Sequence, residues 1–109
     1  MTAEPTGRAL GWVLRSDATG EAGALSFRIL PGGEKTIGRA KGVDFVIDAA
    51  LVSRVHCRLT AHPAGRLEVQ DLDSTNGTFV NGRRVTRTEL NVGDRLGVGR
   101  VELTVGRES

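Results

Sequence analysis

The sequence predicts an all-β protein built as an antiparallel sandwich or barrel. Apolar and polar residues alternate with a period of two in several short runs, the pattern expected where successive strand side chains point to opposite faces of a sheet. Clusters rich in Gly, Asn, Asp and Pro separate these runs and are typical of tight turns. Helical periodicity is nearly absent from the chain. Short strands joined by such turns favour an antiparallel architecture.

The alternation predicts strands near residues 10–14, 25–29, 55–62, 67–69 and 101–105. Turn signals lie between them, at 17–20, 31–33, 63–65, 76–77, 81–82 and 99–100. In the run at 55–62 the apolar face begins with Val55 and Cys57, and His56 is predicted to lie on the opposite, more polar face. Thr86–Leu90 is the single segment with helical character, and it is too short to affect the fold class.

The length and composition predict one folded domain. With 109 residues, 39% of them hydrophobic and 26% charged, the chain can bury a single core and is unlike a disordered sequence. We expect the domain to span residues 8–106, between a flexible N-terminal tail at 1–7 and a C-terminal tail at 107–109. No apolar run approaches the ~20 residues of a membrane span, and residues 1–7 do not resemble a signal peptide. We therefore expect a cytoplasmic location and no membrane partner.

The charged, aromatic and sulfur-containing residues argue against several function classes. The formal net charge is only +2, there is no Lys/Arg block, and one Trp and three Phe are the only aromatic residues, so nucleic-acid binding is disfavoured. The lone Cys57 cannot form an internal disulfide and is interpreted as a small core residue. No motif for a cofactor is present, and none is expected. The strong preference for Arg over Lys suggests a GC-rich genome and hence a bacterial source.

Three short polar stretches lie at the ends of the predicted strands: 38–39, 53–56 and 73–78. Together they contain two guanidiniums, several hydroxyls, an amide and glycine-rich backbone. Guanidiniums and hydroxyls are the donors that bind a phosphate group, and an amide can hold an adjacent peptide backbone. Each stretch alone is a weak signal, but their order along the chain is informative.

This order and spacing resembles the forkhead-associated (FHA) domain. The match consists of Gly38-Arg39, then Ser53-Arg54-x-His56, then 74–78 followed by Asn81-Gly82, and it extends over roughly residues 10 to 105. The resemblance implies a β-sandwich of about eleven strands with ligand-binding loops at one end. It also implies a non-catalytic adaptor that binds phosphothreonine in a partner protein, and therefore an indirect dependence on a Ser/Thr kinase.

The resemblance also assigns roles to particular residues. Arg39 would pair with the phosphate, Ser53 would donate its hydroxyl to a phosphate oxygen, and Arg54 would add a second basic contact. Thr75 would contact the phosphate, and Asn76 would hold the peptide backbone beside the phosphothreonine. Three further positions would shape the loops without touching the ligand: Gly38, His56 and Gly77.

Other interpretations of the same residues remain open at this stage. Ser53 and His56 could form a nucleophile–base pair, although no orienting acid is identifiable. His56, Cys57 and His62 could hold zinc, but a fourth ligand is missing. The domain could also be a phosphate-independent scaffold that binds partners through a sheet face.

The sequence leaves the choice of partner open. A basic rim at Arg83, Arg84 and Arg87 could attract acidic peptides, or these residues could form a solvated hairpin. Selectivity for residues that follow the phosphothreonine would reside in variable loops, for which Leu51, Val52 and 82–85 are the candidates. The preferred peptide sequence, the kinase and the oligomeric state are not predicted.

Overall fold

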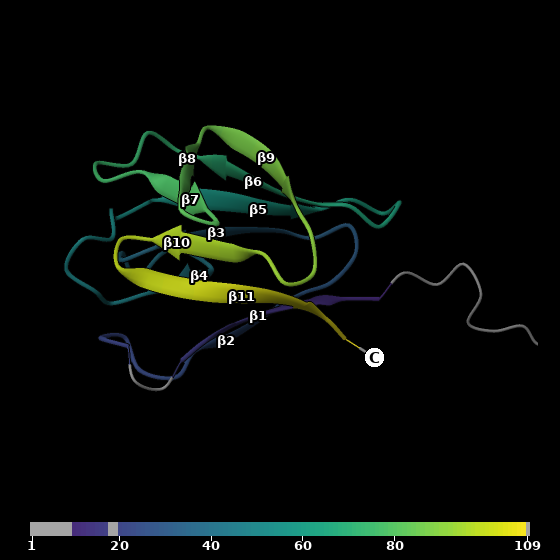
Figure 1. The fold of residues 1–109 in the computed structure, drawn as a ribbon, viewed down its shortest axis with the longest axis horizontal. Coiled ribbons are helices and arrows are strands. Elements are labelled where there is room, and N and C mark those ends of the chain that lie inside the picture. The colour runs from purple at the N-terminus through teal and green to yellow at the C-terminus, as the bar shows by residue number, and fades with distance from the viewer. Residues whose placement is uncertain (1–9, 18–19, 109) are drawn as a thin grey trace, which may run out of the picture.

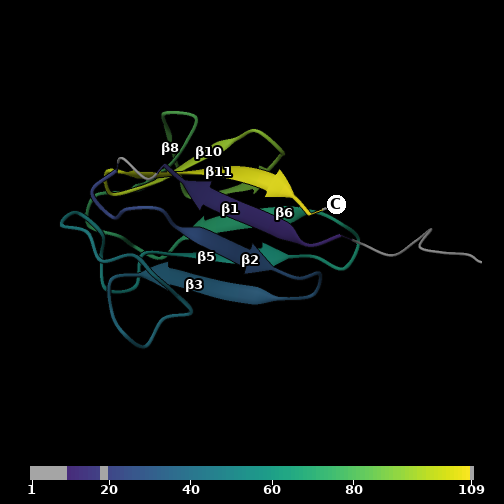
Figure 2. The same ribbon diagram turned by 90° about the horizontal axis from the view of Figure 1, so that it is seen from below.

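The computed structural model describes residues 10–17 and 20–108, which form two packed β-sheets (Figures 1 and 2). The described residues form no helix and eleven strands, so the predicted all-β sandwich is confirmed. The strands are β1 (Trp12–Ser16), β2 (Ser26–Ile29), β3 (Glu34–Gly38), β4 (Phe45–Val46), β5 (Cys57–Ala61), β6 (Leu67–Asp71), β7 (Thr78–Val80), β8 (Arg83–Val85), β9 (Arg87–Leu90), β10 (Arg95–Val98) and β11 (Val101–Arg107).

One sheet contains six strands in the order β2-β1-β11-β10-β7-β8, and the other contains five in the order β4-β3-β5-β6-β9. All paired neighbours are antiparallel except β3 and β4, which run parallel. Figure 2 shows β1 and β11 lying across the sandwich from β3 and β5. The alternating apolar residues of both sheets meet between them, and the largest fully buried side chains include Leu14, Ile37, Leu59 and Leu103.

The segment Thr86–Leu90 contains a strand and not a helix, so its predicted helical character is wrong. Residues 87–90 form β9, which pairs with β6 and places Leu90 opposite Leu67. Both leucines are almost fully buried. Pairing with an existing sheet edge satisfies the backbone and buries Leu90, which an isolated helical turn of this length cannot do.

The predicted alternation also fails at the start of β5. Val55 is 47% exposed and His56 is fully buried, which reverses the predicted sides of these two residues. Strand β5 begins only at Cys57, so Val55 and His56 belong to the preceding loop and do not follow the pleat of the strand. From Cys57 to Ala61 the buried and half-buried positions alternate as predicted.

At the C-terminal end, β11 extends through Arg107, and the Glu108 carboxylate pairs with the Arg28 guanidinium at 2.7 Å. The Arg107 guanidinium lies 4.1 Å from the centre of the Trp12 ring. Of the expected C-terminal tail, Arg107 is therefore the last residue of β11, and Glu108 contacts the β2 residue Arg28. The expected N-terminal tail at 1–7 lies outside the described residues. Within the described residues, no helix is long and apolar enough to cross a membrane.

Candidate phosphopeptide groove

The register of the five-stranded sheet brings the three polar stretches to one end of the sandwich. Ile37, Cys57 and Asp71 lie side by side on β3, β5 and β6. Neighbouring strands here run in opposite directions. Strand β3 therefore ends, β5 begins and β6 ends at the same end of the sheet. The loops that follow β3, precede β5 and follow β6 are therefore neighbours, although they are far apart in the sequence.

These loops form an open groove of about 580 Å³. All five residues to which the resemblance gives a ligand contact line it: Arg39, Ser53, Arg54, Thr75 and Asn76. Ser53 is half-buried at its base, and the other four are exposed. The groove is also lined by Ala50, Leu51, Val52, Val55 and Asp73. Within the described residues neither Arg39 nor Arg54 forms an ion pair, so both guanidiniums are available to an anion.

Gly38 sets the position of Arg39 in the groove. The Arg39 N–H donates to the Ser53 carbonyl at 2.9 Å, and the Ala40 N–H donates to the Arg54 carbonyl at 3.1 Å. A Cβ on Gly38 would overlap the Arg54 carbonyl oxygen and would lie 3.0 Å from the Val55 Cα. Only glycine therefore allows these two backbone segments to approach so closely.

The Ser53 hydroxyl connects two of the loops. Its oxygen accepts a hydrogen bond from the Thr75 N–H at 2.9 Å. Because a hydroxyl has one proton and two lone pairs, this contact leaves the Ser53 proton free for another acceptor. The Asn76 side-chain amide donates to the Leu51 carbonyl at 3.0 Å and joins the same two loops from the other side.

His56 supports the groove from below and is fully buried. Its Nδ1 accepts a hydrogen bond from the Ser53 N–H at 3.0 Å, so the ring proton is on Nε2, which donates to the Gly77 carbonyl at 2.8 Å. The ring thus links the 53–56 and 73–78 stretches. Since His56 contacts the Ser53 backbone and not its hydroxyl, this geometry does not make His56 a base for Ser53.

A second polar cluster stabilises the turn at 71–78, and the sequence interpretation assigned no individual role to Asp71, Ser74 or Thr78. The Asp71 carboxylate accepts hydrogen bonds from the Ser74 N–H, the Ser74 hydroxyl and the Thr78 hydroxyl. The Ser74 oxygen in turn accepts from the Gly77 N–H at 3.0 Å. Burial raises the pKa of Asp71, but the hydrogen bonds from Ser74 and Thr78 outweigh it and hold the pKa below its ordinary value. An Asp three residues before a Ser in a turn is the local signal that could have indicated this cluster.

Gly77 completes the turn with a φ of +91°, a conformation that favours glycine. A Cβ at this position would also lie 2.8 Å from the Arg84 Nε. The Arg84 guanidinium therefore lies against the 76–77 turn, beside the groove. Arg87 does not join it, because its guanidinium is bound to the Glu68 carboxylate at 2.9 Å on the outer face of the five-stranded sheet.

The geometry does not support the metal interpretation. His62 lies at the far end of β5 and contacts Glu68 at 3.3 Å, whereas Cys57 is buried in the core. Burial raises the pKa of Cys57 to about 12, so its thiol stays protonated. Across residues 10–17 and 20–108, no three His, Cys, Asp or Glu side chains are grouped closely enough to hold a metal ion.

The comparisons with known proteins point to one family. A family model described as "FHA domain" matches residues 35–99. An ABC transporter ATP-binding/permease protein of Mycobacterium tuberculosis is 46% identical over 74 residues, which are 68% of this chain and 8% of the transporter. The chain spans only 8% to 15% of the length of three curated relatives that it matches.

Two solved structures resemble nearly the whole chain. One, described as an analysis of phosphothreonine-dependent FHA domain interactions, has a TM-score of 0.78 and 27% identity, and the match covers 93% of this chain and 99% of the other. The second, Mycobacterium tuberculosis EmbR in complex with a low-affinity phosphopeptide, has a TM-score of 0.78 and 27% identity over 94% of this chain and 26% of the other. The family model, the strand arrangement and the order of the groove residues agree, and the chain belongs to the FHA domain family.

Proposed function

We propose that this domain is a non-catalytic adaptor that binds phosphothreonine in a linear motif of a partner protein. The observation that carries the proposal is the convergence of Arg39, Ser53, Arg54, Thr75 and Asn76 on one groove. A phosphothreonine has about −1.5 to −2 charges at neutral pH and three acceptor oxygens. These match the Ser53 hydroxyl proton and two guanidiniums that form no ion pair with the described part of the chain. Solved relatives described with phosphothreonine-dependent interactions and with a phosphopeptide support the same ligand class.

Each groove residue has a distinct role in this proposal. Arg39 and Arg54 neutralise the phosphate, since a guanidinium remains charged at every physiological pH and can engage two oxygens. Ser53 donates its free hydroxyl proton to a phosphate oxygen, and Thr75 contacts the phosphate beside it. Asn76 lies at the exposed rim, where its amide can hold the peptide backbone.

The buried residues keep these groups in place before the ligand arrives. His56 ties the Ser53 N–H to the Gly77 carbonyl, and Gly38 allows the Arg39 and Arg54 backbones to pair. A preformed groove lowers the entropy lost on binding. We infer a partner phosphorylated by a Ser/Thr kinase and a cytoplasmic location, with neither nucleic acid nor a membrane as the ligand.

The test is a binding titration with a degenerate phosphothreonine peptide library and its unphosphorylated twin. We expect binding of the phosphorylated library only. Arg39→Ala should weaken it about tenfold to a hundredfold, because hydrogen bonds to charged groups contribute about 1.5–3 kcal/mol. Arg66→Ala removes an exposed arginine from the turn at the opposite end of the sandwich and should leave the affinity unchanged.

The same titration, together with a turnover assay on an ester substrate, discriminates the alternative functions. Equal affinity for both libraries would contradict the proposal and would favour a phosphate-independent scaffold that binds through a sheet face. Turnover of an ester substrate that Ser53→Ala abolishes would instead indicate an enzyme.

A phosphoserine library should bind only about fourfold more weakly if the groove encloses the threonine methyl, since one buried carbon contributes about 0.8 kcal/mol.

A further inference from the structure

The outer face of the six-stranded sheet contains a row of basic residues that lies outside the phosphopeptide groove. Arg15 of β1 is directly opposite Thr104 of β11, and Thr104 is directly opposite Arg95 of β10. All three residues are exposed. Because residues opposite each other in an antiparallel sheet point to the same side, the Thr104 hydroxyl lies between two arginine side chains.

This row lines a hollow on the outer face of the six-stranded sheet. It has a volume of about 750 Å³, and Arg100 and Ser16 also line it. A second hollow of about 430 Å³ continues along β1 and β11 and shares Arg15 and Thr104. Gly106 lines this second hollow and has no side chain to fill it. The two hollows form one trough along the sheet.

The arginines that line the first of these hollows have few ion-pair partners within the protein. Among the described residues, neither Arg15 nor Arg100 forms an ion pair, and Arg95 reaches Glu102 only at 3.8 Å. Neighbouring strands are about 4.8 Å apart and β11 lies between β1 and β10, so the backbones of Arg15 and Arg95 are about 10 Å apart. Two long guanidinium side chains at this spacing can hold an anion between them.

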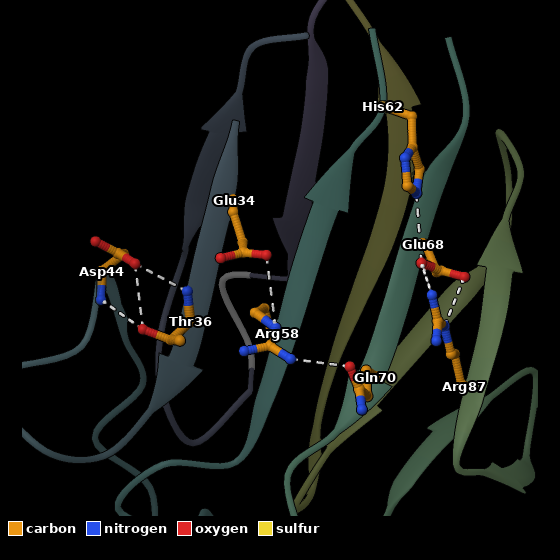
Figure 3. Close-up of polar contacts among 8 residues, drawn as sticks. All are labelled: Glu34, Thr36, Asp44, Arg58, His62, Glu68, Gln70 and Arg87. Atoms are coloured by element: carbon orange, nitrogen blue, oxygen red, sulfur yellow. Dashed lines mark hydrogen bonds and ion pairs between the residues drawn. The ribbon is translucent and has the colours of Figure 1, made fainter. Parts of the chain in front are cut away.

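The outer face of the five-stranded sheet differs in this respect (Figure 3). There the Glu68 carboxylate is bound by both Arg87 and His62. On the same face the Arg58 guanidinium donates to the Gln70 side chain at 3.0 Å, and Asp44 accepts from Thr36. Each of these charged groups has a polar partner, whereas Arg15 and Arg100 of the trough have no ion pair among the described residues.

We propose that the trough binds an extended acidic segment of a partner protein as a second interaction surface. In an extended segment, side chains on the same side are about 7 Å apart, so two carboxylates can reach the Arg15 and Arg95 guanidiniums together. Asp17 and Glu102 line the same hollow and can accept hydrogen bonds from the segment's backbone. A peptide can turn its backbone N–H groups toward these two carboxylates and its spaced acidic side chains toward the arginines, whereas a nucleic acid would present continuous phosphates to both.

The experiment is an amide chemical-shift titration of the ¹⁵N-labelled domain with a short unphosphorylated peptide of alternating Glu and Ser. Its twin, in which Gln replaces every Glu, is the matched ligand control. We expect shifts at Arg15, Arg95 and Thr104 with the acidic peptide only, and their loss at high salt. Arg15→Gln combined with Arg95→Gln should weaken binding about tenfold, since each removes one exposed charge pair.

The matched control is the double variant Arg66→Gln and Lys41→Gln, which removes the same charge from two exposed positions elsewhere and should leave the affinity unchanged. Equal shifts with both peptides, equal weakening by both double variants, or shifts confined to Arg39 and Ser53 would overturn the proposal. Concentration-dependent shifts on both outer sheet faces without peptide would overturn it as well, because they would assign the trough to a second copy of the chain. Since neither peptide has a phosphate, the result is independent of the phosphothreonine titration.

Discussion

The groove has a buried half and an exposed half that differ in how their polar groups are satisfied. In the buried half, His56, Asp71, Ser74 and Thr78 bond to one another or to loop backbone. Within the described residues, the only buried side-chain polar atom without a partner is the Arg107 Nε, which is not in the groove. In the exposed half, neither Arg39 nor Arg54 forms an ion pair with any residue in 10–17 or 20–108.

This difference separates stability from binding. A buried polar group that loses its partner costs the desolvation of the group left behind, whereas an exposed arginine without a partner stays solvated by water. The buried half should therefore determine whether the loops hold their shape. The exposed half should determine whether an anion binds to that shape.

The largest expected effect on stability is that of His56→Ala. It leaves the Ser53 N–H and the Gly77 carbonyl without partners and opens a cavity, for an expected loss of about 3 kcal/mol in the free energy of unfolding. Urea denaturation measures this loss. His62→Ala, on a half-buried histidine at the far end of β5, should cost less than about 1 kcal/mol. Equal losses for the two variants would contradict the supporting role of His56.

Gly38→Ala should have the next largest effect. The added methyl would meet the Arg54 carbonyl, which is backbone and cannot move freely, so we expect a loss of about 2 kcal/mol and weaker phosphopeptide binding. Gly42→Ala is the matched control, because no atom lies within 4 Å of its Cβ position and its φ is not positive. Denaturation of the two variants side by side distinguishes local crowding from a general effect of replacing glycine.

Asp71 should give the buried half a dependence on pH. Its pKa is lowered in the folded state, so its contribution to stability is fully present above the pKa of the unfolded chain, near about 4, and is lost as the pH falls through the folded-state pKa. Asp71→Asn should therefore reduce the loss of stability between neutral and acidic pH. Denaturation curves for both proteins across this range measure the difference. The other carboxyl groups are present in both proteins, so their contributions to the pH dependence cancel. Parallel pH profiles would show that Asp71 does not titrate as inferred.

The smallest expected effect on stability is in the exposed half. Arg39→Gln removes a solvated charge without an ion pair and should change the free energy of unfolding by less than about 0.5 kcal/mol. The same variant should lose most of its phosphopeptide affinity. A large loss of stability would mean that Arg39 supports the loops and that the two halves are not separable.

Much of the fold and of the groove could be predicted from local sequence. Alternation within 101–105 and 57–61 marked strands of the observed sheets, because the period of two follows from strand geometry alone. The turn at Asn76-Gly77 was also visible, and Gly77 has the positive φ that such a turn requires. The side chains predicted to contact a ligand were identified from the order of the motifs along the chain, and all five line one groove.

Other features could not be predicted because they depend on distant residues. Arg87–Leu90 is a strand only because β6 offers an edge to pair with. His56 is buried because the Ser53 N–H and the Gly77 carbonyl both need a partner at the same point. Arg87 was grouped with Arg84 by proximity in the sequence, but a strand position directs it to Glu68 on another face.

The amino-acid sequence by itself determined the strands, the turns and the set of polar groups offered to a ligand, because these depend on residues a few positions apart. Only the tertiary structure decided which of those groups meet. The Ser53 hydroxyl bonds to a backbone amide 22 residues away, and Asn76 bonds to a carbonyl 25 residues away. Such contacts form only once the register of β3, β5 and β6 has brought their loops to one end of the sheet. Residues so far apart in the chain cannot be held together by local interactions.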